Sequence, residues 1–198
     1  MNNKKIAAIV LAATVGMGSG VMQMTGAVPA FGTGAAISSA QMVQAAASPS
    51  ATSLANAIKK AYGESYWPNY KLTKSEIKDK YGVASSLYSS AYAEVPMISA
   101  QVDELVIFKA KNTSSKKKIL TAVKKYQKKL KEETLQYPMN VLKIQGSKVY
   151  TNGNYVCFFM LGGTVDRNLE ENGTEEELIK AYKQMNKKAV NTVKNKLK

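Results

Sequence analysis

Two uninterrupted apolar runs dominate the pattern of hydrophobic and polar positions. Residues 105–108 and 155–161 combine β-branched, aromatic and other apolar side chains, which is typical of strands buried on both faces of a sheet. A third run, residues 95–98, is separated from the first by a short polar break. We expect 95–98 and 105–108 to be paired strands, with 105–108 in the centre of the sheet and 155–161 beside it.

Helical periodicity predicts two short helices before these strands. Apolar residues recur at helical spacing over about residues 53–62, where Ser53 is the expected cap. Thr73 and Glu76 have the spacing of a capping box, in which each side chain satisfies a backbone donor of the other residue. Gly82 is expected to end that second helix in a left-handed conformation.

Two longer helices are predicted later in the chain. One begins at Ser114 or Ser115 and ends near Thr134, and the other starts near Thr174. Their apolar residues fall on single stripes, Ile119, Val123, Tyr126 and Leu130 in the first and Leu178, Tyr182, Met185, Ala189 and Val193 in the second. Pro138 follows the first helix and favours extended backbone before it, so residues 141–150 are predicted to be a strand. Asn152 and Gly153 then predict a hairpin that leads into residues 155–161.

This order of elements predicts an α+β domain. We expect a two-layer arrangement, with a four-stranded, mostly antiparallel sheet in the order 1-2-4-3, helices packed on one face, and additional N-terminal helices. A single domain is expected over residues 53–198, after a linker at 48–52.

The N-terminal 47 residues have the pattern of a secretory signal peptide with a small-residue tail. Two lysines precede an apolar run at residues 6–15, which is too short to span a bilayer, and small residues follow. Cleavage is expected after Ala30, Ala45, Ala46 or Ala47. No cysteine follows the apolar run, so we expect no lipid anchor, no membrane span in the mature form, and a secreted protein that is free or associated with the cell wall.

Composition restricts the chemistry further. The formal net charge is +14, and all but one of the 28 basic residues are lysines. A basic surface favours anionic surroundings, but scarce arginine argues against sequence-specific nucleic-acid recognition. Histidine is absent, which removes the commonest general base near neutral pH, and no cofactor is expected. Cys157 is the one cysteine and lies in an apolar run, where a buried thiol is expected.

Four segments resemble a known family of exported proteins of Gram-positive, clostridial-type bacteria, domain of unknown function 4358. They are YGESYWPNY, AYAEVPMISAQVDELVIFKAK, LQYPMNVLKIQGSKVY and GNYVCFFMLGG, and they cover roughly residues 57–163. The resemblance implies a small extracytoplasmic domain with no assigned activity and no assigned catalytic residues. Many members of the family are similar to lipoproteins, whereas this chain lacks the lipid-accepting cysteine.

Carboxylates provide one candidate for catalysis and one for metal binding. Glu94, Asp103 and Glu104 surround the predicted central strands, and two carboxylates that flank a sugar can hydrolyse a glycosidic bond. The alternative is that these three are exposed or turn-forming side chains. Asp166, Asn168, Glu170 and Glu177 occupy four positions of a calcium-loop template, although Glu171 stands where the template needs glycine and Glu177 also fits a capping box with Thr174.

Two groups of residues are candidates for binding. Tyr66, Trp67 and Tyr70 could stack on a carbohydrate or contact a surface protein, unless they pack in the core. The long lysine-rich helix could bind an anionic wall polymer through the residues Lys117, Lys124, Lys125 and Lys128, unless these lysines are a solvated face. We therefore expect a non-enzymatic domain that binds or scaffolds at the bacterial surface or in the medium. The alternatives are a hydrolase of polysaccharide or cell wall and a secreted effector that acts on host or neighbouring cells.

Overall fold

The computed structural model describes residues 48–98, 100–133, 135–163 and 165–198, and its centre is a five-stranded antiparallel sheet. The strands are β1 (Tyr70–Lys71), β2 (Tyr88–Val95), β3 (Glu104–Ala110), β4 (Lys148–Asn152) and β5 (Tyr155–Met160). Their order across the sheet is β1-β2-β3-β5-β4. The two strands with continuous apolar sequence, β3 and β5, therefore pair in the middle, as predicted, with Ile107 opposite Cys157.

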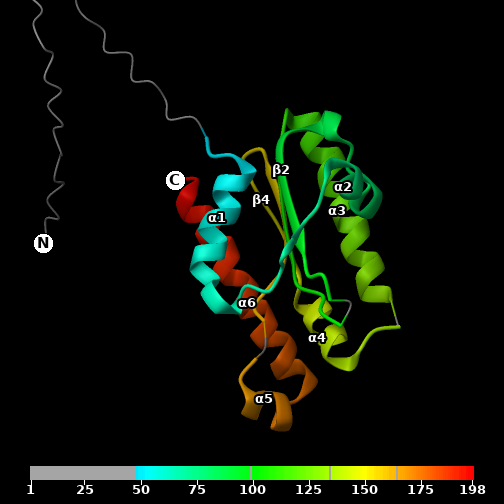
Figure 1. The fold of residues 1–198 in the computed structure, drawn as a ribbon, viewed down its shortest axis with the longest axis vertical. Helices are drawn as coiled ribbons and strands as arrows, with labels where there is room; N and C mark the ends of the chain where they lie inside the picture. The colour runs from blue at the N-terminus through cyan, green and yellow to red at the C-terminus, as the bar shows by residue number, and fades with distance from the viewer. Residues whose placement is uncertain (1–47, 99, 134, 164) are drawn as a thin grey trace, which may run out of the picture. The chain divides into compact units, whose positions relative to one another are not determined.

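Helices cover both faces of the sheet (Figure 1). Helices α1 (Ala51–Tyr62) and α6 (Glu175–Lys196) pack on one face, where Leu105, Ile107 and Phe159 point. Helices α2 (Lys74–Tyr81) and α3 (Thr113–Glu132) cover the other face, where Val106 and Phe108 point. Because successive side chains of a strand point to opposite faces, an uninterrupted apolar strand requires this cover on both sides.

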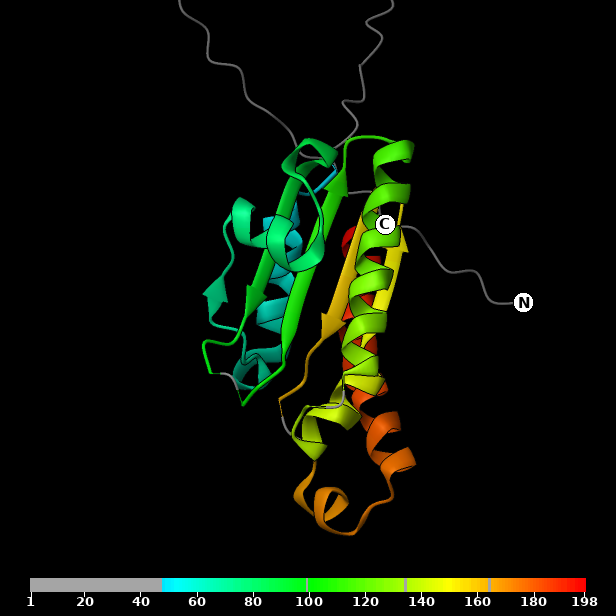
Figure 2. The ribbon, with the colours of Figure 1, turned by 90° about the vertical axis from the view of Figure 1, so that its right-hand side faces the viewer.

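The remaining helices lie at the end of the sheet where β5 finishes. These are α4 (Pro138–Gly146) and α5 (Arg167–Asn172), and two short 3₁₀ helices occur elsewhere, η1 (Gly63–Ser65) and η2 (Ser85–Leu87). Helix α4 packs closely against α6, because Gly146 has no side chain: a Cβ atom there would lie 2.5 Å from that of Tyr182. Figure 2 shows α3 running along the strands in front of the sheet, with α4 and α5 beyond its end.

The α+β class and the antiparallel sheet are confirmed, but three details of the predicted fold are wrong. The sheet has five strands instead of four, because the two-residue edge strand β1 was not predicted, so the order 1-2-4-3 is incomplete. The arrangement is not two-layered with helices on one face, since α1 and α6 lie opposite α2 and α3. Helix α1 also begins at Ala51, inside the expected linker.

Two predicted strands are shifted or replaced. The first, residues 95–98, is in fact the end of β2 and a loop, in which Met97 and Ile98 are exposed. Residues 141–150 begin as helix α4 and become strand only at Lys148. Pro138 starts α4 because its fixed φ and missing N–H suit the first turn of a helix.

The helix ends show which local signals were read correctly. The capping box of Thr73 and Glu76 and the left-handed Gly82 after α2 are both present, with a φ of 69° at Gly82. Ser50, not Ser53, caps α1. Asn112, not Ser114 or Ser115, caps α3, since its side-chain oxygen accepts a hydrogen bond from the Ser115 backbone. The expected signal peptide and its cleavage sites lie outside the described residues.

Candidate functional site

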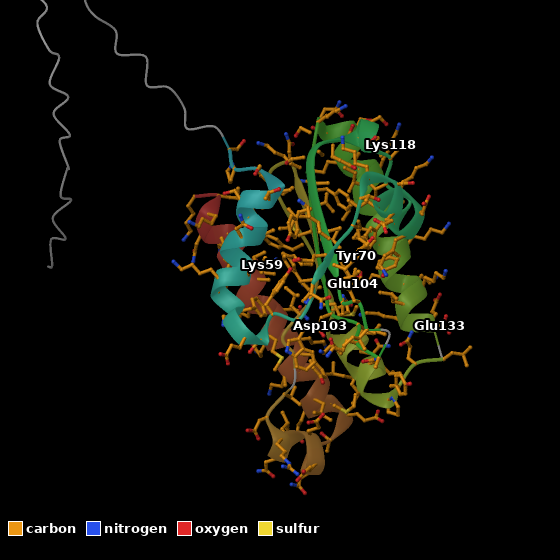
Figure 3. All side chains as sticks on the ribbon, in the orientation of Figure 1. Lys59, Tyr70, Asp103, Glu104, Lys118 and Glu133 are labelled. Carbon is orange, nitrogen blue, oxygen red and sulfur yellow. The ribbon has the colours of Figure 1, made fainter. Side chains whose placement is uncertain are left out.

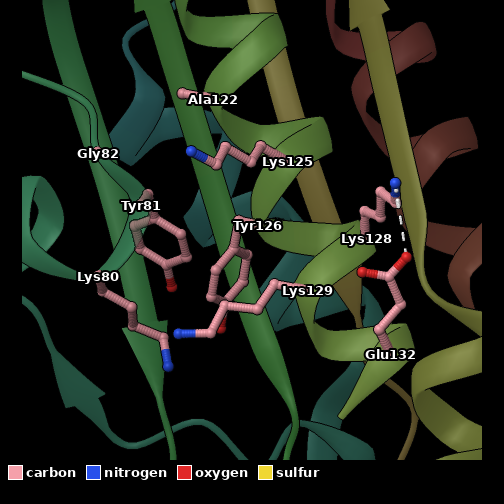
Figure 4. Close-up of a pocket in the computed structure, with 9 residues that line it drawn as sticks. All are labelled: Lys80, Tyr81, Gly82, Ala122, Lys125, Tyr126, Lys128, Lys129 and Glu132. Atoms are coloured by element: carbon pink, nitrogen blue, oxygen red, sulfur yellow. Dashed lines mark ion pairs between the residues drawn. The ribbon is translucent and has the colours of Figure 1, made fainter.

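A groove of about 600 Å³ lies between α2 and α3 on the outer side of the sheet (Figure 4). Its walls are two helices whose apolar stripes face the sheet, so that their polar residues remain at the surface. The lining residues are Lys80, Tyr81, Gly82, Ala122, Lys125, Tyr126, Lys128, Lys129 and Glu132. Positive charge and aromatic rings are therefore the main chemistry of this groove.

Helix α3 supplies most of the positive charge. It carries eight lysines, and Glu132 is its one acidic residue. Ile119 and Val123 are buried against the sheet, which places the lysines on the remaining surface of the helix. Within the described residues, the one carboxylate pair of an α3 lysine is Lys128 with Glu132, at 3.5 Å. The other α3 lysines thus present positive charge that no described carboxylate neutralises by direct contact.

Two tyrosines form the inner wall of the groove, and both bond to a buried carboxylate that does not itself line it. The rings of Tyr81 and Tyr126 meet edge to face, with centroids 4.8 Å apart. Their hydroxyls donate hydrogen bonds of 3.0 Å and 2.6 Å to the two oxygens of Glu104. The Nζ atom of Lys80 lies 2.9 Å from the same carboxylate and within 6 Å of both ring centroids.

This cluster holds α2 and α3 against the start of β3, and its exposed, positively charged member is Lys80. Burial raises the pKa of both tyrosines, and the nearby Glu104 charge raises these pKa values further. Both hydroxyls therefore remain protonated donors near neutral pH. Glu104 is only 4% exposed and already accepts from two hydroxyls and one ammonium group, so it is poorly placed to reach a substrate.

A second buried carboxylate, Glu94, lies on the opposite face of the sheet. Its oxygens accept hydrogen bonds from Lys59 of α1 at 2.9 Å, from Tyr66 at 2.5 Å and from Tyr92 at 2.8 Å. Burial raises the pKa of Tyr66, and the hydrogen bond to Glu94 adds to that effect. Glu94 is therefore the centre of a network that joins α1, the following turn and β2.

The third carboxylate, Asp103, is fully buried beside a small cavity of about 150 Å³. Lys143 of α4 donates to it at 2.6 Å and to the Gly163 carbonyl at 2.5 Å, while the Gly163 N–H donates to Asp103 at 3.2 Å. The ammonium group also lies over the rings of Trp67 and Tyr182. Burial raises the pKa of Asp103, and Lys143 opposes this rise.

The three candidate catalytic carboxylates thus belong to three separate networks. Glu94 and Glu104 face opposite sides of the sheet, and Asp103 contacts α4. Figure 3 shows Asp103 and Glu104 close together, whereas Lys118 lies toward the N-terminal end of α3 and Glu133 lies at its C-terminal end. Glycoside hydrolysis by paired carboxylates requires two of them to line the same cavity. No two of Glu94, Asp103 and Glu104 do so among the described cavities.

The aromatic candidates do not form one stacking surface. Tyr66 is half-buried and bonded to Glu94, and Trp67 is half-buried over Lys143. Tyr70 is 39% exposed and donates its hydroxyl hydrogen to Glu76 at 2.7 Å. Each ring therefore contacts a different neighbour, and Tyr66 packs against the core on the α1 side of the sheet.

The four lysine candidates, unlike the aromatic ones, lie on a single helix. All four lie exposed on α3, and two of them, Lys125 and Lys128, line the groove, whereas Lys117 and Lys124 do not. The sequence interpretation missed Lys80 and Tyr81, because they reach the groove only through the packing of α2 against α3. It placed Tyr126 correctly on the apolar stripe but gave it no part in a site.

The residues of the calcium-loop template have other partners. Asp166 caps α5 by accepting from the backbone N–H groups of Asn168 and Leu169, and Glu177 forms the capping box of α6 with Thr174. Glu170 lines the small cavity near Asp103, and Glu177 is not among the residues that line it. Across the described ranges, no group of three or more Cys, Asp or Glu side chains is arranged to hold a metal ion. The thiol of Cys157 is fully buried, and this burial raises its pKa.

A comparison with protein families gives a match to the central part of the chain. The family described as domain of unknown function (DUF4358) matches residues 61–161, just over half of the 198 residues. The chain belongs to DUF4358. No curated protein and no solved structure matches it.

The DUF4358 match contains the whole sheet and the helices from α2 to α4, and it therefore includes every residue that lines the α2–α3 groove. Most of α1 and all of α5 and α6 lie outside the matched range. Among the described helices, none combines the length and the apolar composition that crossing a bilayer requires.

Proposed function

We propose that this DUF4358 protein is an exported, non-enzymatic domain that binds an anionic polymer or surface at the outside of the bacterial cell. The α2–α3 groove and the lysines of α3 are the proposed contact surface. Export rests on the pattern of the N-terminal residues, in which a basic start, an apolar run and small residues follow one another.

One observation carries the binding proposal. Helix α3 has eight lysines and one acidic residue, and it borders a groove whose inner wall is aromatic. Closely spaced positive charges repel one another, so a surface of this kind is best matched by a partner that supplies negative charge at several points. Lysine offers a compact point charge rather than a bidentate fork, which suits a repeating anion more than a specific base or single phosphate.

The geometry gives less support to the hydrolase alternative. Glu94, Asp103 and Glu104 are each enclosed by hydrogen-bond donors in separate networks, and none shares a described cavity with another of the three. The groove itself contains Glu132 as its one lining carboxylate. A secreted effector remains compatible with export, but no contact surface of the described residues favours it over anion binding.

The test is retention on immobilised inorganic polyphosphate at increasing salt. The variant Lys125→Gln/Lys128→Gln/Lys129→Gln removes three groove charges, and we expect its affinity to fall by roughly ten- to a hundredfold. The matched control, Lys187→Gln/Lys194→Gln/Lys196→Gln, removes three exposed charges from α6 and keeps the same net charge. We expect the control to bind nearly as well as the wild type. Equal losses in the two variants would show that net charge alone drives retention and would contradict a site on α3.

Export is tested separately in the producing cell. Fractionation followed by sequencing of the mature N-terminus should give a protein outside the cytosol that begins shortly after Ala30, Ala45, Ala46 or Ala47. An unprocessed chain in the cytosol would contradict this part of the proposal.

A further inference from the structure

Large apolar side chains are exposed next to the lysine-rich surface, at the end of the sheet where β3 begins. Their exposed fractions are 73% for Met97, 60% for Ile98, 90% for Leu135 and 66% for Tyr137. They lie in two loops, the β2–β3 connection and the α3–α4 connection. Among the described residues, Tyr70 is the one other exposed large hydrophobic, at 39%. Such a concentration of exposed apolar groups on a monomer marks a contact with a partner or a membrane.

The two loops lie together. The side-chain amide of Asn140, in the first turn of α4, donates a hydrogen bond of 3.1 Å to the Ala100 carbonyl of the β2–β3 loop. The same turn is fixed to the α3–α4 loop, because the Asn140 N–H donates to the Tyr137 carbonyl at 2.9 Å. Both loops are therefore held at one end of the molecule, and we call Met97, Ile98, Leu135 and Tyr137 the apolar tip.

The apolar tip is continuous with the charged surface. Gln136, between Leu135 and Tyr137, lines a second hollow together with Lys129, Lys80 and Tyr126, all three of which also line the main groove. Figure 2 shows α2 and α3 on the side of the sheet that faces the viewer. The carboxylates near this end of α3 are Glu132, which is paired with Lys128, and Glu133 and Asp79, which line the second hollow.

We infer that the anionic partner is the surface of a lipid bilayer that contains anionic lipids, with the α3 lysines at the headgroups and the apolar tip inserted below them. This inference rests on the proposed function and names its partner. A soluble polyanion would use the lysines but would leave the apolar tip in water. A bilayer interface supplies both partners, because peripheral proteins bind through apolar burial together with attraction of lysines to anionic headgroups.

The experiment compares vesicles with a soluble anion. The wild-type protein is sedimented with vesicles of phosphatidylcholine alone and with vesicles of equal parts phosphatidylcholine and phosphatidylglycerol, and its retention on inorganic polyphosphate is measured in parallel. We expect clear binding to the anionic vesicles and weak binding to the neutral ones. The variant Met97→Ser/Ile98→Ser/Leu135→Ser/Tyr137→Ser should lose vesicle affinity by at least about tenfold while its polyphosphate retention stays unchanged.

Single substitutions give a matched comparison. Leu135→Ser should weaken vesicle binding measurably, whereas Ile179→Ser, which changes a half-buried position on α6, should not. Unchanged melting temperatures show that each variant is folded. Leu135→Trp adds a second tryptophan to Trp67, and lipids brominated in their acyl chains should quench the fluorescence of this variant more than that of the wild type, which reports insertion at position 135.

The outcomes separate this inference from the proposed function. Wild-type retention on polyphosphate without vesicle binding would overturn the bilayer inference and leave the anion-binding proposal standing. Vesicle binding that is unaffected by the apolar-tip variant would also overturn the inference, since lysines alone would then suffice. Failure to bind both anionic vesicles and polyphosphate would overturn the proposed function itself.

Discussion

Glu94 and Glu104 point to opposite faces of the sheet, although both lie at the same end of neighbouring strands. Glu94 is the register partner of Leu105, the residue after Glu104, and adjacent residues of a strand alternate between faces. Each carboxylate is consequently enclosed by its own lysine and tyrosines, Glu94 under α1 and Glu104 under α2 and α3.

This separation predicts that the two carboxylates stabilise the fold independently. Glu104→Gln should lower the free energy of unfolding by about 1.5–3 kcal/mol, because it weakens hydrogen bonds to a charged group inside the protein. The exposed Glu132→Gln should change it by less than about 0.5 kcal/mol. Denaturant unfolding of Glu94→Gln, Glu104→Gln and the double variant tests independence. Additive losses are expected, and a double variant that departs from the sum by more than about 0.5 kcal/mol would show that the networks are coupled.

Asp103 and Lys143 predict a pH effect with a definite sign. Burial raises the pKa of Asp103 above its ordinary value of 3.8 in the folded protein, so the folded state holds this proton more tightly than the unfolded state. The contribution of Asp103 to stability should therefore fall as pH rises from about 3.8 through the folded-state pKa. The measurement is the difference in unfolding free energy between wild type and Asp103→Asn across this range.

Lys143→Met sharpens the same test. Removal of the ammonium group takes away the charge that opposes the effect of burial, so the pKa of Asp103, followed by NMR of its carboxyl carbon, should rise further. A pKa that moves downward in Lys143→Met would contradict the observed ion pair.

The capping box at the start of α6 gives a further prediction. Thr174→Ala should lower the free energy of unfolding by about 1 kcal/mol, because the N–H of Glu177 loses its acceptor. Thr192→Ala, within the same helix, is the control and should have a smaller effect, since Thr192 only donates to the carbonyl of Lys188.

The same variant should change the titration of Glu177. The backbone N–H and hydroxyl of Thr174 hold the pKa of Glu177 below its ordinary value of 4.5, so this interaction stabilises the fold above that pH and is lost as pH falls through the lowered pKa. In Thr174→Ala the pKa of Glu177 should move back toward 4.5. An unchanged pKa would show that the hydroxyl does not contribute.

The central strands could be predicted from sequence because their signal is local. A short unbroken apolar run such as that of β5 fits a buried strand or a buried helix, and its β-branched and aromatic residues, with glycines directly after it, favour the strand; all six residues of β5 are buried. A strand that is apolar on both faces also implies that helices cover both faces of the sheet. The two-layer prediction, with helices on one face, did not take this into account. Residues 141–146 of α4 were predicted as strand because Pro138 was interpreted only as the end of the preceding helix, whereas a proline also suits the first turn of a new helix.

The candidate site could be predicted only in part, for a physical reason. The charge of α3 is a property of consecutive residues and was visible in the sequence. Lys80 and Tyr81 enter the groove because α2 packs beside α3, and that contact depends on tertiary structure rather than on local pattern. Two residues of the apolar tip, Met97 and Ile98, were predicted to belong to a strand, because a run of four apolar residues does not reveal whether their side chains are exposed.

The most direct test of the account is to locate the anion on the folded protein. Amide NMR spectra of the protein are recorded while short-chain inorganic polyphosphate is added, and the shifted signals report which residues contact the ligand. We predict shifts concentrated in α2 and α3, around Tyr81, Lys125 and Lys129, that disappear at high salt and in the α3 triple variant. Shifts centred on α6, or none on any helix, would contradict a binding surface on α3.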